Sequence, residues 1–190
     1  LMINEFGVGL AAGGMMSTIT NLGMLLGGVV FGVLADKYGR VRVFTYTIIL
    51  FAVGTALTAF ATSMEQVYLY RFIAGIGAGG EYGIGMALVA EAWPKNKQGR
   101  ASSYVSVGAQ YGVILAALLS AMILPTLGWR ALFFVGILPV IFAFIVRRNL
   151  GESPEWLEAQ KNKKKTKAEE SNKLLQLINT PKIAWTTIAL

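Results

Sequence analysis

Residues 6–35 read FGVGLAAGGMMSTITNLGMLLGGVVFGVLA, and this stretch contains no Asp, Glu, Lys or Arg. Two further long stretches without these four residue types lie between Arg42 and Glu65 and between Arg100 and Arg130. A helix of about 20 apolar residues crosses the roughly 30 Å of hydrocarbon in a bilayer. Each stretch is long enough for such a helix, so the sequence predicts an all-α polytopic membrane protein.

Two more spans are expected although they carry charges. Residues 66–89 contain Arg71 and Glu81, and residues 127–146 contain Arg130 near their start. A membrane-embedded barrel would instead show alternating polar and apolar residues in segments of about 10. The five expected spans are therefore helical and cover residues 11–34, 43–61, 66–89, 102–124 and 127–146.

The composition excludes several classes of function. Of the 190 residues, 55% are hydrophobic and 14% are charged, and the chain has no cysteine and no histidine. We therefore expect no disulfide framework, no metal site and no cofactor. No nucleophile, base and orienting group can be assembled, so an enzyme is not expected. The net charge of +7 does not indicate a nucleic-acid partner, because the basic residues follow the expected topology.

Basic residues cluster on alternate connections between the spans. Those connections contain Lys37, Arg40 and Arg42, then Lys95, Lys97 and Arg100, and finally Arg147 and Arg148. The other connections hold little beyond Glu5, Glu65 and Arg130. Lys and Arg in short loops mark the cytoplasmic side. We therefore expect a multi-pass protein of the cell membrane with residue 1 outside and residues 149–181 in the cytoplasm.

Both ends of the chain suggest further segments. The first ten residues contain neither an initiator Met nor a signal-peptide layout. After Lys182, an apolar run continues to Leu190 and is too short to cross a bilayer. We expect residues 1–148 to form the membrane bundle, 149–181 a cytoplasmic linker, and 182–190 the truncated start of another helix. The lysine-rich part of the linker is either solvated or attracted to anionic lipid.

Residues 32–42, GVLADKYGRVR, form the first motif. Asp36 is expected at the carboxyl end of one helix, and Lys37 and Arg40 near the amino end of the next. Each charge is then on the unfavourable side of the helix dipole and needs a compensating partner. Gly39 permits a tight turn and Gly32 close helix packing.

Residues 71–83, RFIAGIGAGGEYG, form the second motif. The spacing from Gly75 to Gly80 also fits the dinucleotide-binding pattern GxGxxG. That interpretation fails, because no strand precedes the motif and Arg100 stands where the ribose-binding acid should be. We expect these glycines to let helices approach closely, as do the pairs Gly23/Gly27 and Gly28/Gly32.

Two more elements complete the pattern. Residues 91–95, EAWPK, are followed by Gln98-Gly99-Arg100, and residues 151–157 read GESPEWL. The last element also suits an ordinary helix start, with Pro154 after a capping serine.

Together these elements resemble the major facilitator superfamily. The second motif is similar to that of metabolite:proton symporters and sialic-acid transporters, and the last two are similar to elements of sugar porters. The resemblance implies that the chain is a fragment of this fold, comprising helices 2 to 6 of the amino-terminal six-helix half and the start of helix 7. It also implies partners in the same protein, namely helix 1 and the carboxyl-terminal half.

In this family the charged residues of the first motif and of the element that begins at Glu91 form a cytoplasmic latch between helices. The resemblance assigns that role here to Gly32, Asp36, Lys37, Gly39, Arg40, Arg42, Glu91 and Arg100. The sugar-porter pattern has an arginine at the position of Gln98. This departure leaves the partner of Glu91 open.

Arg71 and Glu81 are the only charged residues well inside an expected span. A charge within the membrane costs about 2.5–3.5 kcal/mol on insertion scales, so both are expected to face the bundle interior or a water-filled cavity. They either pair with other helices or act in transport, Glu81 by exchanging a proton and Arg71 by holding an anionic solute or orienting the proton site. Asn21, Gln110 and Tyr111 are further candidates, either as helix contacts or as substrate contacts.

The resemblance implies a secondary active transporter that works by alternating access between its two halves. We expect proton-coupled symport of a small polar metabolite, such as an organic acid, a sialic-acid-like compound or a sugar, driven by the proton gradient across the bilayer. Proton-driven efflux is the alternative within transporters. A membrane sensor or scaffold with the same fold is the alternative outside them.

Overall fold

The computed structural model describes residues 2–138, 140, 141, 151–154 and 156–163. The chain divides into two compact units, Leu1–Ser153 and Pro154–Leu190. The first unit contains the helices α1 (Met2–Glu5), α2 (Leu10–Tyr38), α3 (Arg40–Ala59), α4 (Met64–Ala92), the short η1 (Lys95–Lys97) and α5 (Gln98–Val135). In the second unit, residues 156–163 are helical. The described ranges contain no strand, as the sequence predicts.

Four helical stretches in the described residues are long and apolar enough to cross a membrane: Leu10–Tyr38, Arg40–Ala59, Met64–Ala92 and Lys95–Val135. The first three correspond to the first three expected spans and extend beyond the expected limits at one or both ends. The expected linker beyond residue 163 and the expected start of helix 7 lie outside the described residues.

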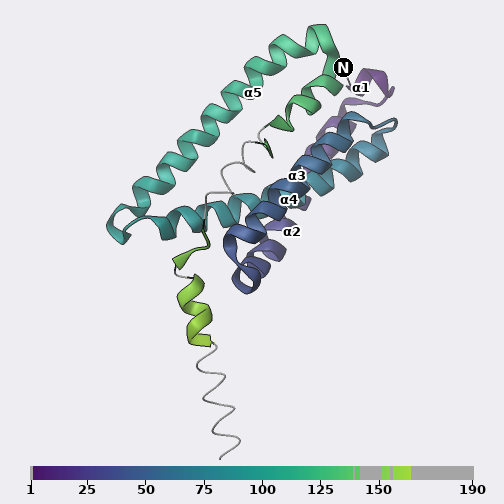
Figure 1. Cartoon of the computed structure of the whole chain (residues 1–190). Helices are drawn as coiled ribbons and strands as arrows, with labels where there is room; N and C mark the ends of the chain where they lie inside the picture. The colour runs from purple at the N-terminus through teal and green to yellow at the C-terminus, as the bar shows by residue number, and fades with distance from the viewer. Residues whose placement is uncertain (1, 139, 142–150, 155, 164–190) are drawn as a thin grey trace, which may run out of the picture. The chain divides into compact units, whose positions relative to one another are not determined.

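The fourth stretch contains two spans joined by a sharp break. Gly128 has φ 76° and ψ 179°, a conformation open to glycine but strained for other residues. Figure 1 shows α5 running as a long rod and then folding back along itself at this end. We call the described residues 129–138, 140 and 141 the return arm. The break lies two residues after the expected boundary at Pro125 and Thr126, just inside the expected span 127–146. Residues 142–146 of that span are outside the described residues.

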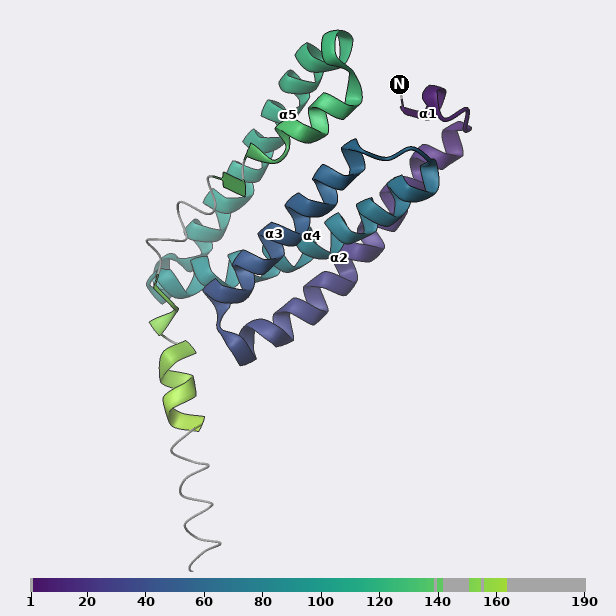
Figure 2. The same cartoon turned by 45° about the vertical axis from the view of Figure 1, so that its right-hand side comes forward.

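Helices α2, α3 and α4 lie side by side (Figure 2), and glycines line their contacts. A Cβ atom on Gly79 would lie 2.6 Å from the carbonyl carbon of Met24, and one on Gly27 would lie 2.6 Å from that of Ile76. On the other side of α4, a Cβ on Gly77 would lie 2.7 Å from the carbonyl oxygen of Thr47. The backbones therefore approach too closely for a side chain at these positions, which confirms that the glycines from Gly75 to Gly80 serve helix packing.

The expectation for Gly32 is not met. A Cβ atom at Gly32 would meet nothing within 4 Å among the described residues. Among the glycines of α2, Gly23 and Gly27 approach the α4 backbone closely, whereas Gly28 makes only ordinary contact, at 3.7 Å from the Gly79 oxygen. Gly32 instead borders a small cleft with Asp36 and Arg40, which residues of α4 also line.

Two apolar clusters fix opposite ends of this three-helix unit. At the end that contains Gly39, which we call the Gly39 end, Ala35, Val43 and Ile84 are buried together. At the other end, which we call the Gly128 end, Ala61, Met64 and Val67 are buried beneath residues of α1 and α2. The functional groups described below lie at these two ends and on α4 between them.

Candidate functional site

A cluster of charged residues lies at the Gly39 end. Arg40, at the start of α3, forms an ion pair with Glu91 near the end of α4, and its guanidinium also lies 3.6 Å from the Asp36 carboxylate. Glu91 and Asp36 both sit near helix carboxyl ends, where a negative charge is unfavourable, and Arg40 sits at an amino end. The cluster supplies the compensating partners that the sequence requires.

The chain that follows the return arm reaches the same cluster. The Glu152 carboxylate accepts a hydrogen bond from the backbone N–H of Val41 at 2.8 Å, and the hydroxyl of Ser153 donates to the Glu91 carboxylate. Glu152 therefore places a negative charge at the amino end of α3, where it interacts favourably with the helix dipole. We call Asp36, Arg40, Glu91, Glu152 and Ser153 the latch cluster.

Gly39 is required at this place for two reasons. Its φ of 109° is rarely adopted by residues that carry a side chain. A Cβ atom there would also lie 2.5 Å from one carboxylate oxygen of Glu152. Glycine thus allows both the turn between α2 and α3 and the approach of Glu152.

Other residues assigned to the latch lie outside this cluster. Lys37 sits 5.3 Å from the ring centroid of Tyr38, while Arg42 and Arg100 are exposed. Gln98, which departs from the family pattern, donates to the backbone oxygen of Ala90 at 2.8 Å. Sequence reasoning left the partner of Glu91 open and assigned no site role to Glu152 or Ser153. The sequence feature that could have indicated a role for Glu152 and Ser153 is the element at residues 151–157.

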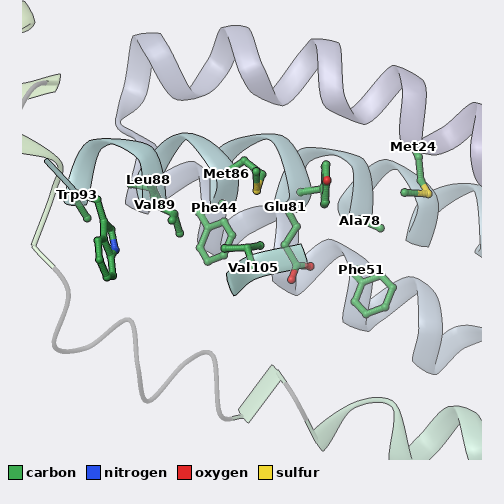
Figure 3. Close-up of a pocket in the computed structure, with 13 residues that line it drawn as sticks. Met24, Phe44, Phe51, Ala78, Glu81, Met86, Leu88, Val89, Trp93 and Val105 are labelled. Carbon is green, nitrogen blue, oxygen red and sulfur yellow. The ribbon is translucent and has the colours of Figure 1, made fainter. Parts of the chain in front are cut away.

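Glu81 lies in a cavity of about 680 Å³ beside α4. Its carboxylate projects between Phe44 and Phe51 of α3 (Figure 3). The cavity is lined mostly by apolar side chains; the lining residues are Met24, Phe44, Phe51, Ala78, Glu81, Tyr82, Gly85, Met86, Leu88, Val89, Ala92, Trp93 and Val105. Glu81 is the only ionisable carboxylate among them.

Arg71 lies in a different environment. Its guanidinium carbon is 5.6 Å from the ring centroid of Phe133 on the return arm. Its Nε atom is buried and has no hydrogen-bond partner among the described residues. Ten helical residues separate Arg71 from Glu81, a rise of about 15 Å. The two charged groups are therefore not a contact pair, as the sequence predicts.

The structure does not bring the five expected cavity residues together. Of Asn21, Arg71, Glu81, Gln110 and Tyr111, only Glu81 lines the described cavity. Asn21, Gln110 and Tyr111 are exposed on α2 and α5, and none of them lines this cavity. Their roles in binding remain predictions.

A second polar cluster, which sequence reasoning missed, lies at the Gly128 end. The Glu5 carboxylate accepts hydrogen bonds of 2.6 Å from Trp129 Nε1 and from Arg130 Nη1. Arg130 also donates to the backbone oxygen of Ala61 at 3.3 Å and lies 4.3 Å from the Trp129 ring centroid. The hydrogen bonds from Trp129 and Arg130 lower the pKa of Glu5 below its ordinary value. We call Glu5, Ala61, Trp129 and Arg130 the Glu5 clamp, which joins α1, the α3–α4 loop and the return arm.

Comparison with known proteins places this architecture in a family. The model of the Major Facilitator Superfamily matches residues 1–190. The "Putative metabolite transport protein" of Haemophilus influenzae is 50% identical over 86% of this chain, which spans 40% of that protein. The sialic acid transporter NanX of Escherichia coli is 37% identical over 80% of this chain, which spans 38% of it. The chain thus covers about two fifths of the length of these relatives.

A solved structure shows the same fold. The partially occluded inward-open xylose transporter XylE from E. coli superimposes with a TM-score of 0.69 and 22% identity, over 77% of this chain and 39% of that one. These matches confirm the resemblance, including its similarity to sialic-acid transporters. Since the family model covers every residue, the chain belongs to the Major Facilitator Superfamily.

Proposed function

We propose that this chain is the helix 2 to 6 region of a secondary active transporter that couples proton entry to uptake of a small organic acid. The whole transporter would include helix 1 and a carboxyl-terminal half, and it would bind its solute between the halves and alternate between two access states. It would lie in the cell membrane with the Gly128 end outside and the Gly39 end in the cytoplasm, as the distribution of basic residues predicts.

The observation that carries this proposal is the placement of Glu81. A carboxylate within a membrane span is energetically costly, because an anion is poorly solvated there. Ionisable residues at such positions therefore usually mark a functional site. Glu81 projects into an apolar cavity, and no ion pair or hydrogen bond from the described residues compensates its charge there. A carboxylate in these surroundings loses its charge when it takes up a proton. Reversible protonation of this kind suits Glu81 to couple transport to a proton gradient.

The solute class is supported by a relative and by the charge of Arg71. NanX transports sialic acid, which carries a carboxylate. Arg71 supplies a positive group inside a membrane span for which the described residues provide no ion pair. An organic acid matches this requirement better than a neutral sugar does.

The Glu81→Gln variant tests the proton role in proteoliposomes that contain the full-length transporter. Gln keeps the shape of the side chain but cannot carry a proton. The variant should lose accumulation driven by a pH gradient while it retains exchange of labelled solute across the membrane. Glu65→Gln, at the exposed start of the same helix, is the matched control and should keep both activities. Full accumulation by Glu81→Gln would exclude Glu81 as the proton carrier.

A further inference from the structure

The turn between α4 and α5 carries three exposed cations. Lys95 and Lys97 lie on η1, and Arg100 lies in the first turn of α5. None of the three forms an ion pair with a described residue. The turn follows Glu91 and therefore lies at the Gly39 end. Uncompensated cations at the junction of two membrane spans form a surface that attracts anions.

The acidic residues at the Gly39 end do not neutralise this surface. Glu91 is engaged by Arg40 and Ser153, Asp36 lies beside Arg40, and Glu152 accepts a hydrogen bond at the start of α3. Helix α5 contains no acidic residue. The described carboxylates at this end thus belong to the latch cluster, and the turn keeps its positive charge.

Local hydrogen bonds hold the turn in shape. Gln98 Nε2 donates to the backbone oxygen of Ala90 at 2.8 Å, which ties the start of α5 to the last turn of α4. The backbone N–H of Lys97 donates to the backbone oxygen of Pro94 at 2.8 Å. A neutral side chain thus closes the turn where the sugar-porter pattern has an arginine. Because the turn is already ordered, less conformational entropy is lost when a ligand binds to it.

Two aromatic rings border the cations. The ring centroids of Trp93, at the carboxyl end of α4, and Tyr104, on α5, lie 6.5 Å apart. Trp93 is 41% exposed and Tyr104 is 67% exposed. Arg100 and Tyr104 are four residues apart on α5, so their side chains share one helix face. Since Trp and Tyr favour the headgroup level of a bilayer, the rings indicate that the cations lie at that level.

We propose that the turn binds the headgroup of an anionic phospholipid. Lys95, Lys97 and Arg100 can donate charge-assisted hydrogen bonds to its phosphate oxygens, and Trp93 and Tyr104 can pack against its glycerol and upper acyl chain. A zwitterionic lipid matches the cations less well because its own ammonium group offsets the phosphate. A soluble phosphate would gain nothing from the rings. The inference goes beyond the proposed transport and depends on neither the solute nor the proton.

The test measures which lipid lies next to the turn in nanodiscs that contain the full-length transporter. This chain has no cysteine, and a Cβ atom on Gly99 would meet nothing within 4 Å, so Gly99→Cys can carry a bimane fluorophore beside Arg100. Any cysteine elsewhere in the transporter is replaced by serine. Brominated phosphatidylglycerol and brominated phosphatidylcholine are compared as quenchers at equal mole fraction. The relative binding constant should favour phosphatidylglycerol by about fivefold or more. The same label on Gly14→Cys, at the Gly128 end, should show no such preference.

Two double variants separate a specific site from attraction by net charge. Lys95→Gln/Lys97→Gln should remove most of the preference, because each cation near an anionic lipid contributes about fivefold to binding. Lys37→Gln/Arg42→Gln removes the same charge from exposed cations of the same end and should leave the preference unchanged. Lys95→Arg/Lys97→Arg keeps both charges and should keep the preference.

The aromatic contribution has its own matched pair of variants. Tyr104→Ala should weaken the preference several-fold. Tyr46→Ala should not, although Tyr46 is also exposed and is the seventh residue of α3, as Tyr104 is of α5.

Three results would overturn the inference. One is equal quenching by the two lipids at the Gly99 label. Another is an equal loss of preference in the two charge-removing double variants, which would assign the effect to net charge. The third is loss of the preference when glycerol 3-phosphate or inorganic phosphate is added, since a soluble phosphate would then be the ligand. The measurement uses neither solute nor proton gradient, so its outcome is independent of the uptake experiments.

Discussion

Glu152 accepts a hydrogen bond from the backbone N–H of Val41, 111 positions earlier in the chain, at 2.8 Å. The contact ties the segment after the return arm to the start of α3. It also explains the glycine of the first motif, because Gly39 leaves the space that the Glu152 carboxylate occupies.

The Gly39→Ala variant should be destabilised by about 1–3 kcal/mol, since alanine would have to adopt a strained φ and displace Glu152. The two causes can be separated in the background of Glu152→Ala, which removes the steric conflict but not the backbone strain. Tm measurements on the four proteins of this cycle should show a smaller cost of Gly39→Ala when Glu152 is absent. Equal costs in both backgrounds would mean that Glu152 does not restrict position 39.

The Arg40–Glu91 pair should contribute to stability through a partly buried, charge-assisted contact. Glu91→Gln should lower the free energy of unfolding by about 1.5–3 kcal/mol, because Arg40 and Ser153 lose their charged acceptor. Arg42→Gln, an exposed cation two residues away, should change it by less than about 0.5 kcal/mol. A double-mutant cycle of Arg40→Gln and Glu91→Gln measures the coupling, and additive effects would contradict the contact.

Much of the fold follows from the sequence because the membrane imposes a simple constraint. A span must be apolar over about 20 residues, so the absence of charges between Glu5 and Asp36 was sufficient to place α2. The break at Gly128 was harder to locate, because Leu124 to Trp129 is apolar on both sides of the turn and contains both a proline and a glycine.

The site was less predictable for a physical reason. The motifs showed that Asp36, Arg40 and Glu91 need partners, but a charge requirement does not say which of several opposite charges is close in space. Ser153 and Glu152 were missed because their element also suits an ordinary helix start. The Glu5 clamp was missed because a single acid in a loop and an arginine at a span end have no distinctive pattern.

The glycines of α4 provide a test of the close helix approach. Gly79→Ala should destabilise the protein by about 1–3 kcal/mol, because its Cβ would overlap the backbone of Met24. Gly83→Ala on the same helix meets nothing within 4 Å and should be neutral or stabilising by up to about 1 kcal/mol. Thermal unfolding of the two variants in detergent checks this difference, and similar effects of both would contradict the α2–α4 packing.

The Glu5 clamp should make stability depend on pH. The pKa of Glu5 is lowered in the folded protein, so its contribution is fully present above the pKa of the unfolded chain, about 4.3, and is lost as the pH falls through the folded pKa. The difference in Tm between the wild type and Glu5→Gln should therefore shrink as the pH is lowered from about 7 to about 3. Glu158→Gln, exposed in the second unit, serves as a control with no such clamp. A difference that grows on acidification would contradict the clamp.

Uptake by the full-length transporter in proteoliposomes, with an inward proton gradient and again after the gradient is collapsed, tests the central claim most directly. The account predicts that at least one organic acid, with N-acetylneuraminate tested first, accumulates above its external concentration only while the gradient is present. Accumulation of acids that is unaffected by collapse of the gradient, or that occurs only under an outward gradient, would contradict proton-coupled uptake.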